Sequence, residues 1–349
     1  MSEPGSIGLG NVHKSAGSCR QNSMHKSGGI LMEPILEIRH LSIYFTQYER
    51  GIRQRQLPVI RDLSLRILPG QITAVVGASG SGKSLLAHGI LGILPYNAHM
   101  DGTILYNGRL LTQKQAEKLR GREISLIPQG VNYLDPLMKV GTQVRKGRKE
   151  EGIREKCRRA LERYGLGKET EELYPFELSG GMARRVLIAS AVTESPRLII
   201  ADEPTPGLDA KAAARILGHF RELADGGAGM LFITHDLELA LTIADRVVVF
   251  YAGETIEDAA ADDFRGASGL RHPFTKALWN AMPEHGFVPL SGAQPYPGTV
   301  ERGCPFADQC GQCRPECRET EQLPLREMNG GMVRCLCPGD QNDKEGASG

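Results

Sequence analysis

The sequence predicts an α/β fold with an antiparallel β portion, a helical insertion and a small Cys-rich module near the C-terminal end. Three observations predict it. The apolar run 72–76 precedes a Gly-rich stretch and a helix-compatible segment, 85–94, as at the start of a parallel β/α core. Charged segments with helical spacing occupy residues 139–194. Six of the eight cysteines lie among the last 46 residues.

The strands follow from two kinds of pattern. Segments 35–45 and 59–67 alternate apolar and polar residues, which predicts two strands of an antiparallel portion. Between them, the polar and Arg-bearing stretch 46–57 predicts a loop. Runs 198–201 and 230–234 are continuously apolar, so we expect two further strands that are covered on both faces.

The helical insertion and the chain ends complete the organisation. Segments 154–164 and 182–192 carry Ala, Leu and Arg at helical spacing, and the periodic pattern fades after Asp263, where Pro and Gly soon become frequent. The expected regions are a disordered tail at 1–33, a main domain at 34–265 with a helical subdomain at about 131–195, a C-terminal module at 266–338 and a disordered tail at 339–349.

Composition excludes several classes of protein. The balance of 42 basic against 41 acidic residues creates no field that would attract nucleic acid or an anionic membrane. No apolar run approaches the roughly 20 residues of a membrane-spanning helix, and the first 29 residues lack the apolar segment of a secretory signal. We therefore expect any membrane association to come through partner proteins.

Residues 77–84 carry the sequence Gly-Ala-Ser-Gly-Ser-Gly-Lys-Ser between the predicted strand and helix. Glycines let backbone N–H groups turn toward phosphate oxygens at a helix N-terminus. The lysine of this pattern reaches the outer phosphates, and the last serine binds Mg²⁺. The residues expected at a nucleotide are Gly77, Ala78, Ser79, Gly80, Ser81, Gly82, Lys83 and Ser84.

Two carboxylates end the strand predicted at 198–201. Asp202 suits a water-bridged Mg²⁺ site, because Mg²⁺ prefers hard oxygen ligands and keeps several waters. Glu203 is then the candidate general base that orients the attacking water.

A second anion-binding position precedes the helix at 182–192. Ser179 and the amides of Gly180 and Gly181 lie where the N-terminal end of this helix is predicted. A single nucleotide needs one phosphate cradle, so the second makes sense if two such domains face each other and each closes the other's ATP.

With these motifs, the chain resembles the nucleotide-binding subunit of an ABC transporter over roughly residues 34–265. The resemblance implies a P-loop NTPase with an ABC-type RecA-like core, an antiparallel β subdomain and a helical subdomain. It also implies that Gln129 contacts Mg²⁺ and the membrane partner, that Asp209 is the D-loop aspartate, that His235 touches the γ-phosphate, and that Phe45 stacks on adenine.

The chain departs from the family pattern in two places. Met182 ends the signature where most members carry Gln, and Pro206-Gly207-Leu208 stands where Ser-Ala-Leu is usual. Since Ser179 and Gly181 are intact, we expect a working signature, and Met182 favours an asymmetric pair of ATPase subunits.

The C-terminal module narrows the resemblance. Segments 272–283, 303–310 and 333–335 resemble the extension of the oligopeptide/dipeptide/nickel importer ATPases. Four thiols there suffice for a [4Fe–4S] cluster or a structural Zn²⁺, and the resemblance favours the cluster. Cys313 and Cys337 offer alternative ligands. The alternative that these cysteines are reduced thiols without a bound metal also remains open. The candidate ligands are Cys304, Cys310, Cys317 and Cys335.

The expected function is an ATP-binding and ATP-hydrolysing importer subunit that energises the uptake of peptides, nickel or metal chelates. Its implied cofactor is Mg²⁺, and its implied partners are a second ATPase subunit, two membrane permeases and an extracytoplasmic solute-binding protein. We expect it at the cytoplasmic face of the membrane. The alternative is a soluble ABC-type ATPase that acts on nucleic acid or ribosomes, which the neutral charge balance and the single cassette disfavour.

Overall fold

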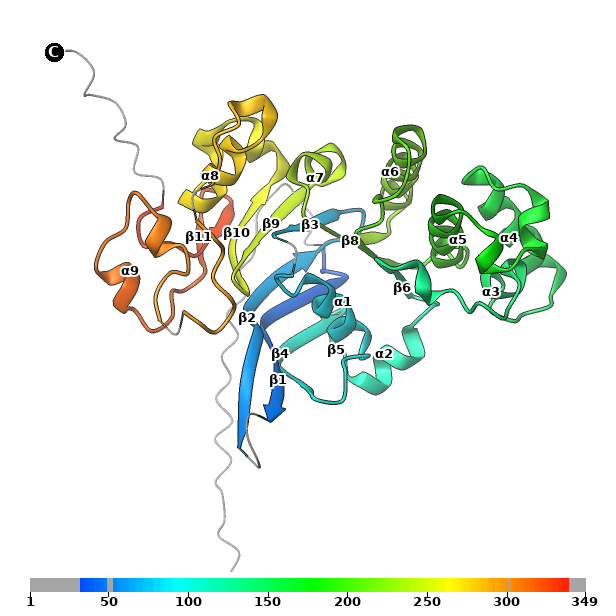
Figure 1. The fold of residues 1–349 in the computed structure, drawn as a ribbon, viewed down its shortest axis with the longest axis horizontal. Helices are drawn as coiled ribbons and strands as arrows, with labels where there is room; N and C mark the ends of the chain where they lie inside the picture. Colours follow the sequence, from blue (N-terminus) through cyan, green and yellow to red (C-terminus); the bar gives the residue numbers. More distant parts are fainter. Residues whose placement is uncertain (1–31, 49–52, 79, 291, 301, 339–349) are drawn as a thin grey trace, which may run out of the picture. The chain divides into compact units, whose positions relative to one another are not determined.

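The computed structural model describes residues 32–48, 53–78, 80–290, 292–300 and 302–338 (Figure 1). The predicted tails lie outside the described residues, apart from Met32 and Glu33.

An antiparallel sheet portion forms from the N-terminal strands. Strand β1 (Leu36–Tyr48) pairs with β2 (Gln54–Ile67) and β4 (Ala98–Tyr106), and β4 pairs with β5 (Arg109–Leu110). The loop expected at 46–57 is wrong at both ends, because the ladder continues to the pair Tyr48 and Gln54. Backbone hydrogen bonds carry a ladder through polar side chains, so side-chain polarity alone misplaced the strand ends.

The parallel core lies between two layers of side chains. Its strands run in the order β6, β7, β8, β3, β9 and are parallel throughout. Ile72, Ala74 and Val76 of β3 pack in one cluster and Val75 in the other. The strands are β3 (Ile72–Val76), β6 (Ile124–Ile127), β7 (Leu198–Asp202), β8 (Gly229–Thr234) and β9 (Arg246–Tyr251).

Helices follow the strands of this core. Helix α1 (Lys83–Leu91) ends earlier than the predicted 85–94, because Gly92 adopts a left-handed C-cap. Since parallel strands present their carboxyl ends at one edge, the segments after β3, β7 and β8 meet there. The other helices of this part are α2 (Gln113–Leu119), α6 (Ala210–Asp225) and α7 (Leu237–Ile243).

The segment that the sequence predicts to be a helical subdomain does form helices. Helix α5 packs against both α3 and α4 (Figure 1), and the short 3₁₀ turns η1, η2 and η3 connect these helices. The elements are η1 (Val131–Tyr133), α3 (Val140–Val144), α4 (Glu151–Arg163), η2 (Lys168–Glu172), η3 (Pro175–Glu177) and α5 (Gly180–Val192).

The C-terminal residues join the core sheet. Strand β10 (Glu254–Ala260) pairs antiparallel with β9 and also with β12 (Gly331–Val333), which forms a hairpin with β11 (Arg326–Met328). The intervening elements are η4 (Ala261–Arg265), η5 (Ala267–Gly269), α8 (Pro273–Asn280), η6 (Pro283–His285), η7 (Ala307–Gln309) and α9 (Glu316–Glu319).

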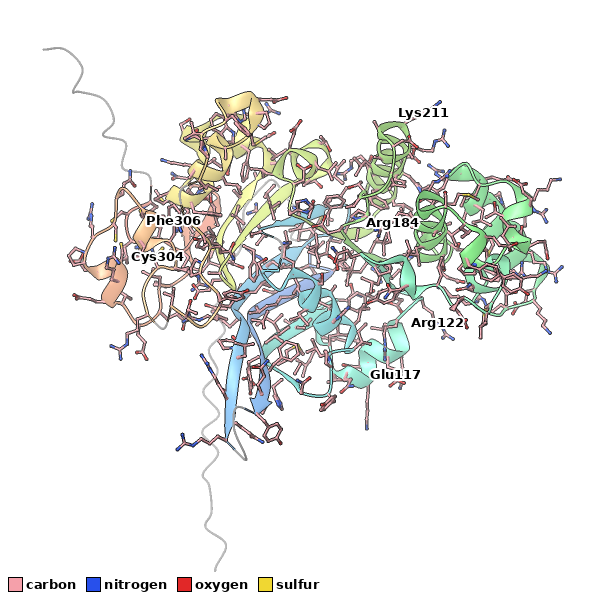
Figure 2. All side chains as sticks on the ribbon, viewed as in Figure 1. Glu117, Arg122, Arg184, Lys211, Cys304 and Phe306 are labelled. Atoms are coloured by element: carbon pink, nitrogen blue, oxygen red, sulfur yellow. The ribbon has the colours of Figure 1, made fainter. Side chains whose placement is uncertain are left out.

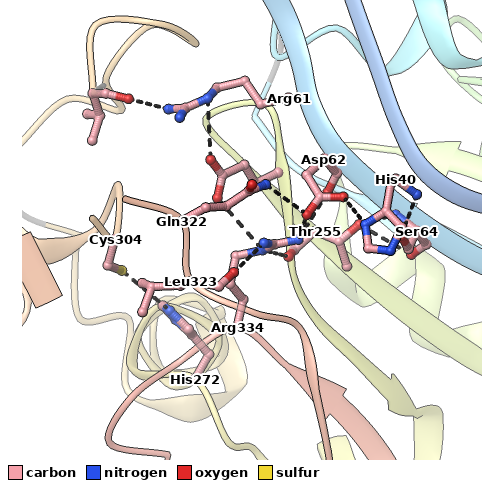
Figure 3. A network of polar contacts seen from close by, with 12 residues as sticks. His40, Arg61, Asp62, Ser64, Thr255, His272, Cys304, Gln322, Leu323 and Arg334 are labelled. Carbon is pink, nitrogen blue, oxygen red and sulfur yellow. Dashed lines mark hydrogen bonds and ion pairs between the residues drawn. The ribbon is translucent and has the colours of Figure 1, made fainter. Parts of the chain in front are cut away.

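A buried arginine ties this region to the antiparallel portion (Figure 3). Arg334 donates to Asp62 Oδ2 at 2.8 Å and to the carbonyl oxygen of Thr255 at 2.9 Å. The side chain of Arg334 is 1 % exposed, so its charge is balanced by Asp62 and by Glu254, whose Oε2 lies 3.7 Å away. The guanidinium of the residue that follows β12 therefore links the end of this strand to both β2 and β10.

Candidate functional site

The loop after β3 requires glycine at positions that the tertiary structure defines. A Cβ at Gly77 would lie 2.5 Å from the carbonyl oxygen of Phe250, and one at Gly82 would lie 2.6 Å from Val59 Cγ1. Gly80 and Gly82 also have φ values of +78° and +93°. Steric contacts and positive φ values therefore require glycine at these positions of the loop. Ser79 lies outside the described residues.

Lys83 lies buried under this loop. Its Nζ donates to the carbonyl oxygens of Gly77 and Ala78 at 2.8 and 2.7 Å. Burial lowers the pKa of Lys83, while the charges of Glu203 and Asp202 oppose that shift. The loop thus holds a cation beside two carboxylates and next to the N-terminal end of α1.

Asp202 ends β7 with an incompletely satisfied carboxylate. Burial raises its pKa, and a hydrogen bond with the Ser84 side chain opposes this shift. Asp202 Oδ1 is buried and accepts no hydrogen bond from the described residues. A buried oxygen without a partner is costly, so this pair fits a hydrated Mg²⁺, whose water would donate to the carboxylate.

Glu203 and His235 face each other across the ends of β7 and β8. His235 Nδ1 lies 2.7 Å from Glu203 Oε1, and the backbone N–H of Glu203 donates to the carbonyl oxygen of Ile233 at 2.9 Å. Glu203 has φ of +48°, which is strained for a residue with a side chain. The imidazole is half exposed and the carboxylate is 9 % exposed, so the pair opens toward solvent on the histidine side.

Gln129 is exposed and lies just after β6. Its neighbour Pro128 is held in place by Arg184, a residue that the sequence analysis missed. Arg184, on the buried face of α5, donates through Nη1 to the carbonyl oxygen of Pro128 at 2.8 Å (Figure 2). Burial lowers the pKa of Arg184, and the charges of Asp202 and Glu203 raise it. The position of Arg184 on the apolar face of a predicted helix is the sequence signal that could have identified it.

The second anion-binding position is formed but lies apart from Lys83. Ser179 is the N-cap of α5, where its Oγ accepts from the N–H of Met182 at 3.3 Å, and a Cβ at Gly180 would meet no atom within 4 Å. A Cβ at Gly181 would lie 3.5 Å from the carbonyl oxygen of Gly207. Among the described residues, Ser179 bonds to Met182 within its own helix start rather than to the loop at Lys83.

Asp209 and Phe45 occupy the remaining predicted positions. Exposed Asp209 caps α6, where its Oδ1 accepts from the N–H of Ala212 at 2.8 Å, and this hydrogen bond lowers its pKa. Phe45 is half-buried on β1, opposite Leu57 of β2 and Ala98 of β4. The signature residues Ser179 to Gly181 and the loop before Asp209 are therefore neighbours. Their polar groups are exposed and can contact a facing surface.

The C-terminal cysteines line one small pocket. Burial raises the pKa of Cys304 to about 12 and of Cys335 to about 11, and it also raises that of Cys310. Within the described part of the chain, no three His, Cys, Asp or Glu side chains are grouped closely enough to hold one metal ion. The pocket's sulfur-bearing residues are Cys304, Cys310, Cys313, Cys317, Cys335 and Cys337.

Two families match this chain. Residues 60–206 match the ABC transporter family, and residues 256–317 match the family described as oligopeptide/dipeptide transporter, C-terminal region.

Curated relatives match most of the chain. The oligopeptide transport ATP-binding protein AppD of Bacillus subtilis (strain 168) is 32% identical over 325 residues, which cover 87% of this chain and 97% of AppD. The oligopeptide transport ATP-binding protein OppD of Escherichia coli (strain K12) is 32% identical, covering 88% and 94%. The probable D,D-dipeptide transport ATP-binding protein DdpD of the same strain is 34% identical, covering 88% and 97%.

Solved structures share the fold. The dimeric structure of MJ0796, a bacterial ABC transporter cassette, is 25% identical with a TM-score of 0.57, and the match covers 65% of this chain and 98% of that one. An ATP-binding subunit of an ABC transporter is 27% identical with a TM-score of 0.56, covering 66% and 92%.

Proposed function

The chain belongs to the ATP-binding subunits of the oligopeptide/dipeptide ABC transporter family, and we propose the following roles for its residues. It binds and hydrolyses ATP and thereby energises peptide uptake by an ABC importer. The relatives reported above are named for oligopeptides or a dipeptide, so we propose peptides as the cargo rather than nickel. A nucleic-acid or ribosome partner is not favoured.

The observation that carries the site proposal is that Lys83, Asp202 and Glu203 lie close together at one edge of the sheet. Lys83 neutralises the outer phosphates, and the backbone N–H groups of 77–84 bind their oxygens. Asp202, Ser84 and Gln129 would hold the Mg²⁺ and its waters. When bound, Mg²⁺ neutralises the charge that develops on the phosphates. Phe45 stacks on the adenine.

Glu203 and His235 perform the proton chemistry in this proposal. Glu203 accepts a proton from the attacking water, and His235 holds the carboxylate in place through its 2.7 Å contact. His235, being half exposed on the same side, is available to the γ-phosphate.

A second ATPase subunit supplies the other half of the pocket. Ser179, Gly180, Gly181 and Asp209 present hydrogen-bonding groups to the outside, as expected for residues that close a partner's ATP. We propose a heterodimer, since Met182 alters the signature. The similar cassette MJ0796 is a dimer in its solved structure.

Gly181→Glu tests this half-site. A Cβ fits at Gly181, and an acidic residue in the first turn of α5 suits the helix dipole, so the variant is expected to fold. Its carboxylate would repel the partner's phosphates. Single-turnover hydrolysis of labelled ATP in the assembled transporter is expected to fall about 10²-fold in the pocket that this signature completes.

The control for that variant is Gly218→Glu. Gly218 lies on the exposed side of α6, with no atom within 4 Å of a Cβ. Hydrolysis should be unchanged there, and equal rates for the two variants would reject the shared pocket.

The membrane partners are proposed to bind beside Gln129. Val131, Tyr133 and Leu137 follow it and are 41%, 52% and 87% exposed, a group of apolar side chains suited to a partner surface. No helix among the described residues is long and apolar enough to cross a bilayer. We propose peripheral attachment at the cytoplasmic face through two permeases, which also receive peptide from a solute-binding protein.

We propose that residues 266–338 form a module appended to a nucleotide-binding domain at 34–265, and that this module holds a [4Fe–4S] cluster on Cys304, Cys310, Cys317 and Cys335. Six cysteine sulfurs line one pocket, and four cysteine thiolates are the ligand set of a [4Fe–4S] cluster, so the donor chemistry of the pocket fits this group.

Anaerobically purified protein is expected to contain about four iron atoms per chain and the broad visible absorbance of a Cys-ligated cluster. Raised thiol pKa values mean that binding releases protons, so iron retention is expected to fall as the pH is lowered. Protein without iron that still binds ATP would reject the cluster and leave the ATPase assignment standing.

A further inference from the structure

His272 lies completely buried beside the cysteine pocket (Figure 3). It is the N-cap of α8, and its ring points toward Cys304, which follows 32 residues later in the chain. Nothing in the roles proposed above uses this imidazole.

The hydrogen bonds fix which ring nitrogen carries the proton. The backbone N–H of Phe274 donates to His272 Nδ1 at 3.0 Å, so Nδ1 is the acceptor and carries no hydrogen. The ring's single N–H in its neutral form is then on Nε2. That atom lies 3.8 Å from Cys304 Sγ, within the range of a hydrogen bond to sulfur.

Contacts from Glu257 and Phe306 fix the position of the His272 ring. Glu257 of β10 is fully buried and accepts the backbone N–H groups of Arg271 and His272, each at 2.8 Å. The ring of Phe306 lies 6.1 Å from the imidazole, measured between centroids.

We infer that His272 is a positioning residue for the iron–sulfur cluster, in which its Nε2–H donates a hydrogen bond to the Cys304 thiolate and raises the reduction potential. The inference rests on the proposed cluster. A donor aimed at a ligand sulfur stabilises the extra negative charge of the reduced form more than the oxidised form. A helix cap alone would need only Nδ1 and would not require a donor facing the cysteines.

His272→Asn separates the two roles of the ring. Asparagine is a preferred N-cap and keeps an acceptor for the Phe274 N–H, but it is too short to bring a donor to Cys304. In the anaerobically purified full chain, we expect the equilibrium between reduced and oxidised cluster to shift about tenfold toward the oxidised form, a fall of about 59 mV for one electron.

The matched control is His285→Asn. His285 lies in the same C-terminal region, stacks on Trp279 with centroids 3.6 Å apart, and among the described residues hydrogen-bonds the carbonyl oxygen of Trp279 rather than a cysteine. Its potential should equal that of the unaltered protein. An unchanged potential in His272→Asn, at equal iron content, would overturn the inference while the cluster stands.

A second measurement needs no variant. The unaltered protein with ¹⁵N-labelled histidine, reduced and studied by pulsed EPR, is expected to show a nitrogen coupling from a hydrogen-bonded imidazole. Absence of that coupling in an iron-loaded sample overturns the inference even if His272→Asn fails to assemble the cluster. Absence of iron in the unaltered protein overturns the cluster and the inference together, and ATP binding distinguishes that result from a misfolded chain.

Discussion

Replacing Glu203 by glutamine is expected to slow ATP hydrolysis about 10²–10⁴-fold and to leave ATP binding intact. The amide has nearly the shape of the carboxylate but cannot accept the proton of the attacking water. Lys83, Ser84 and Asp202 are unchanged, so the residues proposed to bind the phosphates and Mg²⁺ stay in place. Turnover in the assembled transporter and retention of labelled ATP measure the two halves of this prediction.

We further expect the variant to accumulate the closed ATP-bound pair of subunits, because closure requires binding and reopening requires hydrolysis. Glu238→Gln is the matched control, since Glu238 is exposed in the first turn of α7, close in sequence to His235. Turnover of Glu203→Gln close to that of the control would show that another group is the base.

Arg334→Met is expected to lower the free energy of unfolding by about 3–5 kcal/mol. Methionine retains the apolar stem but removes the cation that faces Asp62 and Glu254, whose side chains are 8% and 5% exposed. Burial already raises the pKa of Glu254 against the effect of Arg334, so the carboxylates are costly without it. Chemical denaturation of the full chain measures the loss.

Two further variants separate charge from packing. Arg318→Met removes an arginine from an exposed pair with Asp308 and is expected to leave the denaturation midpoint unchanged. Asp62→Asn added to Arg334→Met should recover part of the loss, because one uncompensated charge disappears. If the double variant is no more stable than Arg334→Met, the cost arises from lost hydrogen bonds to carbonyl oxygens rather than from the buried carboxylate.

Strands and helices were largely predictable because their signal is local. The alternation in 35–45 and the apolar runs at 72–76 and 198–201 state which faces are buried, and the corresponding strands form. The ends were not predictable in the same way. The polar segment after Phe45 stays in the ladder to Tyr48, since its pairing depends on a neighbouring strand rather than on its own side chains.

The sequence by itself determined the Gly-rich loop, the acidic strand end and the capped start of α5. Each of these needs particular residue types within a few positions, because backbone φ, amide direction and capping are local requirements. Gly80 and Ser179 could therefore be named from the chain alone, whereas the close approach of Gly77 to Phe250 and of Gly82 to Val59 belongs to the tertiary structure.

Only the tertiary structure decided which distant side chains meet. Glu203 and His235, Arg184 and Pro128, and Arg334 and Asp62 are separated by 32, 56 and 272 positions. Strand order and register bring them together, and no periodicity within a short window encodes that order. His272 and Cys304 belong to the same group, since the contact exists only after β10 and α8 have fixed the ring.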